Sequence, residues 1–336
     1  MPLLAVVPCP IALLRFAEIT HPERSVLRGE LVKVRPGVYA PTADWKALAP
    51  WERYLARVHA VAAIHPDAIF SHESAAALLG MPVFGDPVVV HVLAPPHATA
   101  RLVTGIRVHT SSGDREIFEL AGLLLTSPAE TAVDLARSRH AGIGVAAADW
   151  VLRSDRTLSI EQLAARNERR RSKRGRALAR WPLASATPLA ETALESISRA
   201  VIEWLGFPSP HLQAIFRSHD GFEDRCDFTW PMISLAGESD GDLKLDGRFG
   251  DPMELLRRRR QRDARLRAHH VRAIAHWGWA EATTIEPLRS LLIGHGLTPV
   301  APEHTAQLFS LRRSVSPHPP HRTAVAETSS DRRDRG

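Results

Sequence analysis

The 336-residue chain has few of the features that mark several common protein classes. Its two cysteines, Cys9 and Cys226, show neither a disulfide framework nor metal or redox spacing, which fits a reducing compartment. No glycine-rich phosphate-binding motif occurs, so nothing supports a nucleotide cofactor. No stretch reaches the roughly 20 apolar residues of a membrane-spanning helix, and prolines interrupt the apolar N-terminal run. We therefore expect a cytoplasmic protein with no membrane partner.

The charge of the chain is concentrated in one segment. The net charge is +6, and residues 161–180 hold 8 basic and 2 acidic residues. Basic clusters bind nucleic-acid phosphates without reading the base sequence, although a solvated helix between domains is the alternative. The cluster predicts DNA contacts by Arg169, Arg170, Arg171, Lys173, Arg174 and Arg176.

The most informative pattern is acidic. Asp227 opens an apolar run, Pro231 favours a turn, and a second apolar run leads into Glu238. An antiparallel hairpin folded at this turn would place Asp227 opposite Glu238, with Asp240 on the same face as Glu238. Carboxylates held together attract a cation, and Mg²⁺ prefers oxygen ligands completed by water and a phosphate. The pattern predicts a Mg²⁺ (or Mn²⁺) site with Lys244 nearby, and a polar turn after a buried strand is the alternative.

The elements around the hairpin have a definite predicted order. An amphipathic helix begins near Glu195 and ends at Gly206, a strand follows at 212–216, and a helix runs from Asp251 to about His269. A strand at 271–276 and a helix at 285–293 complete the order helix, three strands, helix, strand, helix. The helix after the hairpin carries Arg258 and Arg262, which could hold a DNA backbone or pair with neighbouring acids.

Residues 188–296 resemble the restriction-endonuclease-like fold, in the branch related to very-short-patch-repair endonucleases. The resemblance rests on Asp227–Phe228, on Gly237–Gly241 with Lys244, and on the charged helix and strand that follow. It implies an αβββαβα domain that hydrolyses phosphodiesters, with Asp227 and Glu238 as metal ligands and Glu195 as a supporting acid. The wider superfamily has a lysine two residues after the second carboxylate, where this chain has Asp240, so a scaffold kept for binding is the alternative.

The N-terminal half shows a hairpin at 29–40, a helix at 51–63 and strands at 88–93 and 103–110. Helix starts are expected at Ser71 and at Ser127, where Glu130 completes a capping box. The stretches 31–40, 71–82 and 123–137 resemble antitoxins of the abortive-infection (AbiEi) family. That resemblance implies a winged-helix, DNA-binding region and a cognate toxin as partner. We expect packing roles for His72, His91 and His109. No set of histidines, cysteines and aspartates in the chain has zinc-binding spacing.

Together these observations predict a mixed α/β protein with a winged-helix, antitoxin-like α+β half at 1–160 and a basic linker or helix at 161–187. An endonuclease-like domain follows at 188–296, and a tail at 297–336 is expected to be disordered from about residue 314. The predicted function is Mg²⁺-dependent DNA cleavage by Asp227, Glu238, Asp240, Lys244 and Glu195. The alternative is a DNA-binding regulator without catalysis, and the oligomeric state is left open.

Overall fold

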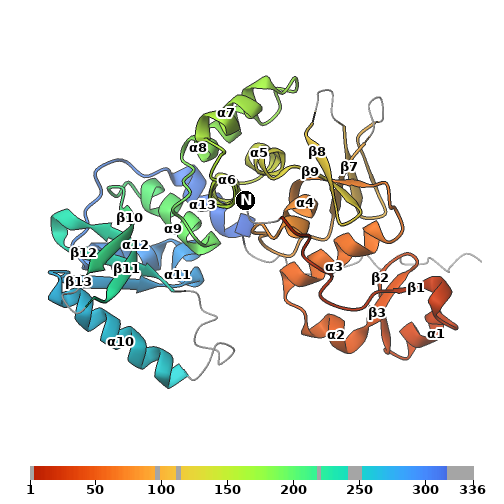
Figure 1. Ribbon diagram of the computed structural model, residues 1–336, viewed down its shortest axis with the longest axis horizontal. Coiled ribbons are helices and arrows are strands. Elements are labelled where there is room, and N and C mark those ends of the chain that lie inside the picture. Colours follow the sequence, from red (N-terminus) through yellow and green to blue (C-terminus); the bar gives the residue numbers. More distant parts are fainter. Residues whose placement is uncertain (1–3, 95–98, 111–114, 218–220, 241–251, 316–336) are drawn as a thin grey trace, which may run out of the picture.

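The computed structural model describes residues 4–94, 99–110, 115–217, 221–240 and 252–315, and it is a mixed α/β protein with three separate sheets (Figure 1). The first sheet is small and antiparallel, in the order β1-β3-β2, and it contains the hairpin that the sequence predicts. Its elements are β1 (Leu14–Arg15), η1 (Phe16–Glu18), α1 (Pro22–Leu27), β2 (Leu31–Arg35), β3 (Val38–Pro41) and α2 (Thr42–Ala47).

The second sheet has six strands in the order β6-β7-β5-β4-β9-β8 and mixes parallel and antiparallel pairs. Helices α3, α4 and α5 pack on it through a shared apolar core that includes Tyr54, Phe70, Leu78 and Leu125. The elements are α3 (Pro50–Ala62), β4 (Ile69–Phe70), α4 (His72–Leu79), β5 (Val90–Leu93), β6 (Arg101–Val103), β7 (Ile106–His109), β8 (Ile117–Leu120), β9 (Leu123–Thr126) and α5 (Pro128–Ser138).

The basic segment is helical and packed. Residues 161–187, expected as a linker or helix, contain α7 (Ile160–Arg169) and α8 (Arg176–Ala184). Leu163 and Leu183 from these helices are buried against Val133 of α5 and Leu152 of α6 (Ala141–Ser154). Helices α5 to α8 therefore lie together between the two larger sheets (Figure 1).

The C-terminal sheet has the order β10-β11-β12-β13, with antiparallel pairs up to β12 and a parallel pair between β12 and β13. The order of elements contains the one that the sequence predicts, helix, three strands, helix, strand and helix, with the short 3-10 turn η2 and helix α11 as additions. They are α9 (Ala193–Trp204), β10 (His211–Arg217), β11 (Glu223–Trp230), η2 (Pro231–Ile233), β12 (Leu235–Ser239), α10 (Pro252–Ala268), β13 (Ala273–Trp277), α11 (Trp279–Thr284) and α12 (Glu286–Gly294).

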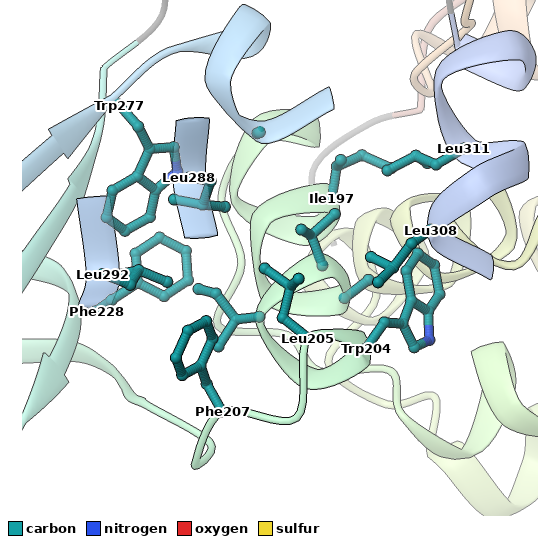
Figure 2. Packing of buried hydrophobic residues seen from close by; sticks show 14 of the residues in the cluster. Ile197, Trp204, Leu205, Phe207, Phe228, Trp277, Leu288, Leu292, Leu308 and Leu311 are labelled. Atoms are coloured by element: carbon teal, nitrogen blue, oxygen red, sulfur yellow. The ribbon is translucent and has the colours of Figure 1, made fainter. Parts of the chain in front are cut away.

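The largest core lies on one face of this sheet. Phe228 and Trp277 project from the sheet toward Ile197 of α9, toward Leu205 directly after the end of α9, and toward Leu288 of α12 (Figure 2). A smaller cluster on the α10 side joins Cys226 and Ala236 to Leu266 and Val271. Gly237 has no side chain for a packing reason, because a Cβ there would stand 2.6 Å from the Trp277 ring.

Two segments outside the C-terminal sheet contribute to the same core. α6 supplies Ile143 and Val145. α13 (Thr305–Val315) supplies Leu308 and Leu311 (Figure 2). The tail expected at 297–336 therefore holds a packed helix, and residues 316–336 lie outside the described residues. Across the described part of the chain, every helix is too short or too polar to cross a bilayer.

Candidate functional site

The acidic hairpin has the predicted register. Phe228 pairs with Gly237 and Trp230 with Leu235, so the next position in the same register sets Asp227 opposite Glu238. Beyond the last backbone pair, the strands are joined through a side chain. Ser239 donates from its N–H and its hydroxyl to Asp227 Oδ2, at 3.0 and 2.9 Å. The Asp227 carboxylate is therefore held in place where the strands part.

Glu238 is buried and paired with an arginine. Its Oε1 accepts a hydrogen bond from Arg262 of α10, and the same guanidinium donates to the Arg225 carbonyl at 2.6 Å. Burial raises the pKa of Glu238, the Arg262 charge opposes that rise, and the nearby Asp227 charge adds to it. Arg262, expected as a DNA contact, therefore bonds to the carboxylate that the sequence predicts as a metal ligand.

Glu195 approaches the same place from α9. It accepts from the Glu191 N–H at 2.9 Å, from the Thr192 hydroxyl at 3.0 Å and from Gln213 Nε2 at 2.8 Å. Burial raises its pKa, and the Asp227 charge also raises it. Asp227 thus interacts with both other acids, although no three acids of this region, among the described residues, bring ligand oxygens within 4.8 Å of one another.

Asp240 points toward α10 and β13. Its Oδ2 lies 2.8 Å from His276 Nδ1 and 3.2 Å from Arg259 Nη2, and the other nitrogen of His276 lies 3.3 Å from Asp263. Lys244 lies outside the described residues, as does the side chain of Arg258.

The predicted DNA-binding residues of the basic segment separate into two sets. Arg170 is internal, with its guanidinium 2.6 Å from both Glu130 and Asp134. Arg176 is half-buried and donates to the Arg170 carbonyl. The remaining four side chains are exposed around the turn between α7 and α8: Arg169, Arg171, Lys173 and Arg174.

Arg137 fixes the shape of that turn by hydrogen bonds to its backbone carbonyls. Its side chain is buried and donates to the carbonyls of Asn167 at 3.0 Å and Arg174 at 2.7 Å, as well as to Ser172. Gly175 lies against it with φ of +71°, and a Cβ there would meet the Arg137 carbonyl oxygen at 2.0 Å. The four exposed cations therefore lie on a turn that is held in one shape.

Three histidines converge in the six-stranded sheet. His72 begins α4, while His91 on β5 and His109 on β7 come from parallel neighbouring strands. One ring nitrogen from each lies within 4.8 Å of the other two. His91 Nδ1 is 2.8 Å from His109 Nε2, and the His72 and His109 rings stack with centroids 4.0 Å apart. His72 and His91 are buried and His109 is half-buried.

Carboxylates stand behind two of these rings. Glu73 Oε2 lies 3.6 Å from His91 Nε2, and Asp134 Oδ2 lies 3.7 Å from His72 Nδ1. Burial lowers the pKa of each of the three histidines to about 4, so the rings are neutral near pH 7.

Arginines neutralise these carboxylates. Arg139 donates to Glu73, and Arg115 lies 2.5 Å from Asp134. Burial by itself would raise the pKa of Glu73, but Arg139 and the neighbouring histidines outweigh it and lower the pKa to about 2. The result is an internal network of imidazoles, carboxylates and guanidiniums.

The sequence predicts only packing roles for these histidines. Their numbers follow no metal-binding spacing, because they are brought together by the β5–β7 pairing and by the start of α4. One signal was available: histidines occurred on two successive predicted strands and at the start of a predicted helix.

Comparison with known proteins finds relatives that are themselves uncharacterized. The chain is 36% identical over 234 residues to the uncharacterized proteins MT2308 and Rv2248 of two Mycobacterium tuberculosis strains. The match covers 69% of this chain and 80% of each relative. No protein-family model and no solved structure matches the chain.

Proposed function

Because the chain belongs to the family of the mycobacterial proteins MT2308 and Rv2248, whose names state no activity, we propose its function from its own residues. The protein binds DNA, and its C-terminal sheet carries a Mg²⁺-dependent site for phosphodiester hydrolysis. The observation that carries the proposal is the arrangement of Asp227, Glu238 and Glu195 on three adjoining elements of an αβββαβα unit.

The electrostatics of the three acids favour a cation. Two of them have raised pKa values, with burial as the first cause and the Asp227 charge as a further one. A divalent ion relieves both effects, because it compensates the lost hydration and screens the carboxylates from one another. Carboxylate oxygens are also the ligands that Mg²⁺ prefers.

Asp227 and Glu238 would hold the ion, which when bound supplies charge stabilisation at a phosphate and an activated water. The hydrogen bonds from Ser239 engage Asp227 through Oδ2 and fix the direction of the carboxylate. Arg262 balances the Glu238 charge and lies on α10 beside the site, so its guanidinium can move to a phosphate oxygen of the substrate.

The exposed turn between α7 and α8 supports DNA binding. Arg169, Arg171, Lys173 and Arg174 form no salt bridge within the described residues, unlike Arg170. Free surface cations of this kind contact backbone phosphates, and affinity then falls as salt rises. The small N-terminal sheet with its β2–β3 hairpin would serve as the wing of a winged helix, as in the antitoxins that the sequence resembles.

A specific observation favours a second function, a DNA-binding regulator without catalysis. Arg262 pairs with Glu238, and Asp240 pairs with His276 and Arg259, so two of the predicted catalytic acids already have cationic partners. In this alternative, arginine replaces the metal ion as the charge that holds the acids together, and a cognate toxin would be the partner.

The test compares cleavage of supercoiled plasmid and mismatched duplexes in Mg²⁺ or Mn²⁺ with DNA binding measured by fluorescence anisotropy. Asp227→Ala and Glu238→Ala should abolish cleavage and leave DNA affinity unchanged, because neither carboxylate belongs to the basic turn. Glu223→Ala is the matched control, since Glu223 lies exposed on the same strand and pairs with Arg217.

Cleavage that survives in both acid variants would contradict the nuclease proposal. Wild-type protein that binds DNA in a salt-dependent way but cuts no substrate with either metal would instead establish the regulator.

A further inference from the structure

The three histidines at the six-stranded sheet are candidate ligands of a second metal centre, far in sequence from the acidic hairpin. Their nitrogens belong to three different elements, yet they meet in one place within 4.8 Å. Among the described residues, this is the one set of three or more histidine, cysteine or acidic side chains that does so. Three imidazoles in such a cluster are the ligand set that zinc takes in open, three-histidine sites.

The protonation of the rings suits coordination. A histidine must be neutral to bind a metal through its lone pair, and burial keeps these three rings neutral near pH 7. A cluster of protonated imidazoles at this distance would instead repel both a cation and one another.

The carboxylates are placed as outer partners of metal-bound histidines. His91 Nε2 lies 3.6 Å from Glu73 Oε2 and 3.4 Å from Arg139 Nη2, which leaves Nδ1, the atom near His109, for a metal. His72 Nδ1 lies 3.1 Å from the Ser71 hydroxyl oxygen and 3.7 Å from Asp134 Oδ2, which leaves Nε2. Metal-bound histidines usually donate their second N–H to a carboxylate, and both carboxylates lie just beyond hydrogen-bond distance of the ring nitrogens here.

Glu73 gives a second, independent indication. Its Oε2 is buried and has no hydrogen-bond partner, although the other oxygen is bonded to Arg139. Leaving a buried carboxylate oxygen unsatisfied is costly. A histidine fixed by a metal through Nδ1 must carry its proton on Nε2, and this proton would then be aimed at Glu73 Oε2.

We propose that His72, His91 and His109 bind one Zn²⁺ ion, with Glu73 and Asp134 as hydrogen-bonding partners of the ligands and a water molecule in the fourth position. The ion ties α4 to β5 and β7. Half-buried His109 is the most exposed of the ligands and marks the side from which the ion and the water enter. The site is independent of the proposed nuclease function, because it shares no residue with the acidic hairpin.

Two adjustments are required on binding. The His72 and His109 rings are stacked with centroids 4.0 Å apart, so they must turn for both nitrogens to face one ion. The rings of His91 and His109 must also separate. Two nitrogens bound to the same tetrahedral zinc at about 2.0 Å lie roughly 3.3 Å apart. His91 Nδ1 and His109 Nε2 are 2.8 Å apart and share a hydrogen bond. The ion therefore replaces that hydrogen bond and moves the rings about half an ångström away from each other. The competing interpretation is that this hydrogen bond is the complete structural role of the pair.

The first experiment uses the full-length protein. After removal of metal with a chelator, Zn²⁺ is added back and measured by mass spectrometry, and Co²⁺ is added in parallel as a spectroscopic probe. We expect about one Zn²⁺ per chain and the intense visible absorption of cobalt in a site of tetrahedral type. We also expect unfolding at higher temperature with Zn²⁺ than with chelator, because a ligand that binds the folded state stabilises it.

Variants then locate the ion. His109→Ala, at the least buried ligand, should lose the bound Zn²⁺ and the cobalt spectrum. Glu73→Gln should keep a full equivalent at saturation but bind Zn²⁺ roughly 10- to 100-fold more weakly. His65→Ala is the matched control, since His65 is exposed in the same half of the chain and should leave binding unchanged.

The wild-type cobalt spectrum decides the matter even if a variant does not fold. Wild-type protein that shows no tetrahedral cobalt absorption and no thermal shift with Zn²⁺ would overturn the proposal and leave the hydrogen-bonded pair as the explanation. Zinc bound equally well by wild type and by folded His109→Ala would also overturn it.

Discussion

At the scale of single residues, the most consequential groups are the buried ones that titrate. In metal-free protein His72, His91 and His109 have pKa values lowered by burial from 6.5 to about 4. The unfolded chain therefore binds protons at a higher pH than the folded chain does. The stability linked to these rings is complete above about pH 6.5 and is lost as the pH falls toward about 4.

Glu73 extends the same trend to lower pH. Its pKa falls from 4.5 to about 2 in the folded protein, because Arg139 and the neighbouring histidines together outweigh the effect of burial. The stability linked to Glu73 is complete above about pH 4.5 and is lost as the pH falls toward about 2. The carboxylate and the imidazoles thus act in the same direction, and their pH ranges adjoin.

We therefore expect the urea midpoint of metal-free protein to fall steadily between about pH 7 and about pH 4.5. His91→Gln removes one of the titrating groups and should make that slope shallower, whatever its effect on stability at neutral pH. His65→Gln, at an exposed position, should leave the slope as in wild type. A wild-type midpoint that stays constant across this range would contradict the internal, neutral state of the three rings.

At the scale of elements, glycines fix two helix ends in different ways. Gly206 ends α9 with φ of +77°, and its carbonyl accepts from the N–H groups of Val300 and Ala301 at 2.7 and 3.1 Å. A Cβ at Gly206 would lie 2.0 Å from the Ala301 carbonyl oxygen. Gly29 follows α1 with φ of +74°, and a Cβ there would meet nothing within 4 Å.

These two glycines form a matched pair. Gly29→Ala should cost about 1 kcal/mol, since it adds only the strain of a left-handed backbone. Gly206→Ala should cost roughly 3 kcal/mol or more, because the same strain is joined by a clash with backbone that cannot move freely. Chemical denaturation of both variants measures the difference. Equal destabilisation would show that the segment at Val300–Ala301 is not held against the end of α9.

Helix ends, helix caps and strand register were the features that the sequence predicted best. Gly206 as a helix end and Ser127 as a helix cap are local signals, and both are present as expected. The capping box expected with Glu130 is not formed, because the Ser127 N–H donates to the Glu116 carbonyl and the Glu130 carboxylate pairs with arginines. The Asp227–Glu238 register followed from strand alternation and one turn. The internal position of Arg170 and the meeting of His72 with His109 depend on contacts between distant segments, which no local pattern contains.

The whole molecule shows why a division near residue 160 does not separate two cores. α6 lies before that boundary, but its Ile143 and Val145 belong to the core of the C-terminal sheet. Asp149 of α6 is fully buried and bonded to Arg199 of α9 at 3.0 and 3.1 Å. His140 Nε2 lies 3.0 Å from the Gln307 carbonyl of α13. These contacts join the N-terminal half to the C-terminal half through buried groups.

We expect the full chain to unfold in one transition, and Asp149→Ala to lower its stability by about 3–5 kcal/mol because Arg199 would lose its buried partner. Unfolding should be followed by hydrogen exchange measured in parallel in the C-terminal four-stranded sheet and in the six-stranded sheet. Both probes should report the same unfolding transition in wild type, and both transitions should shift to lower stability in the variant, since the ion pair connects both halves. A variant in which only the C-terminal probe shifts would mean that the halves unfold separately. In that case the α6–α9 contact is an interface between two independent units, and fragments divided after α6 should fold alone.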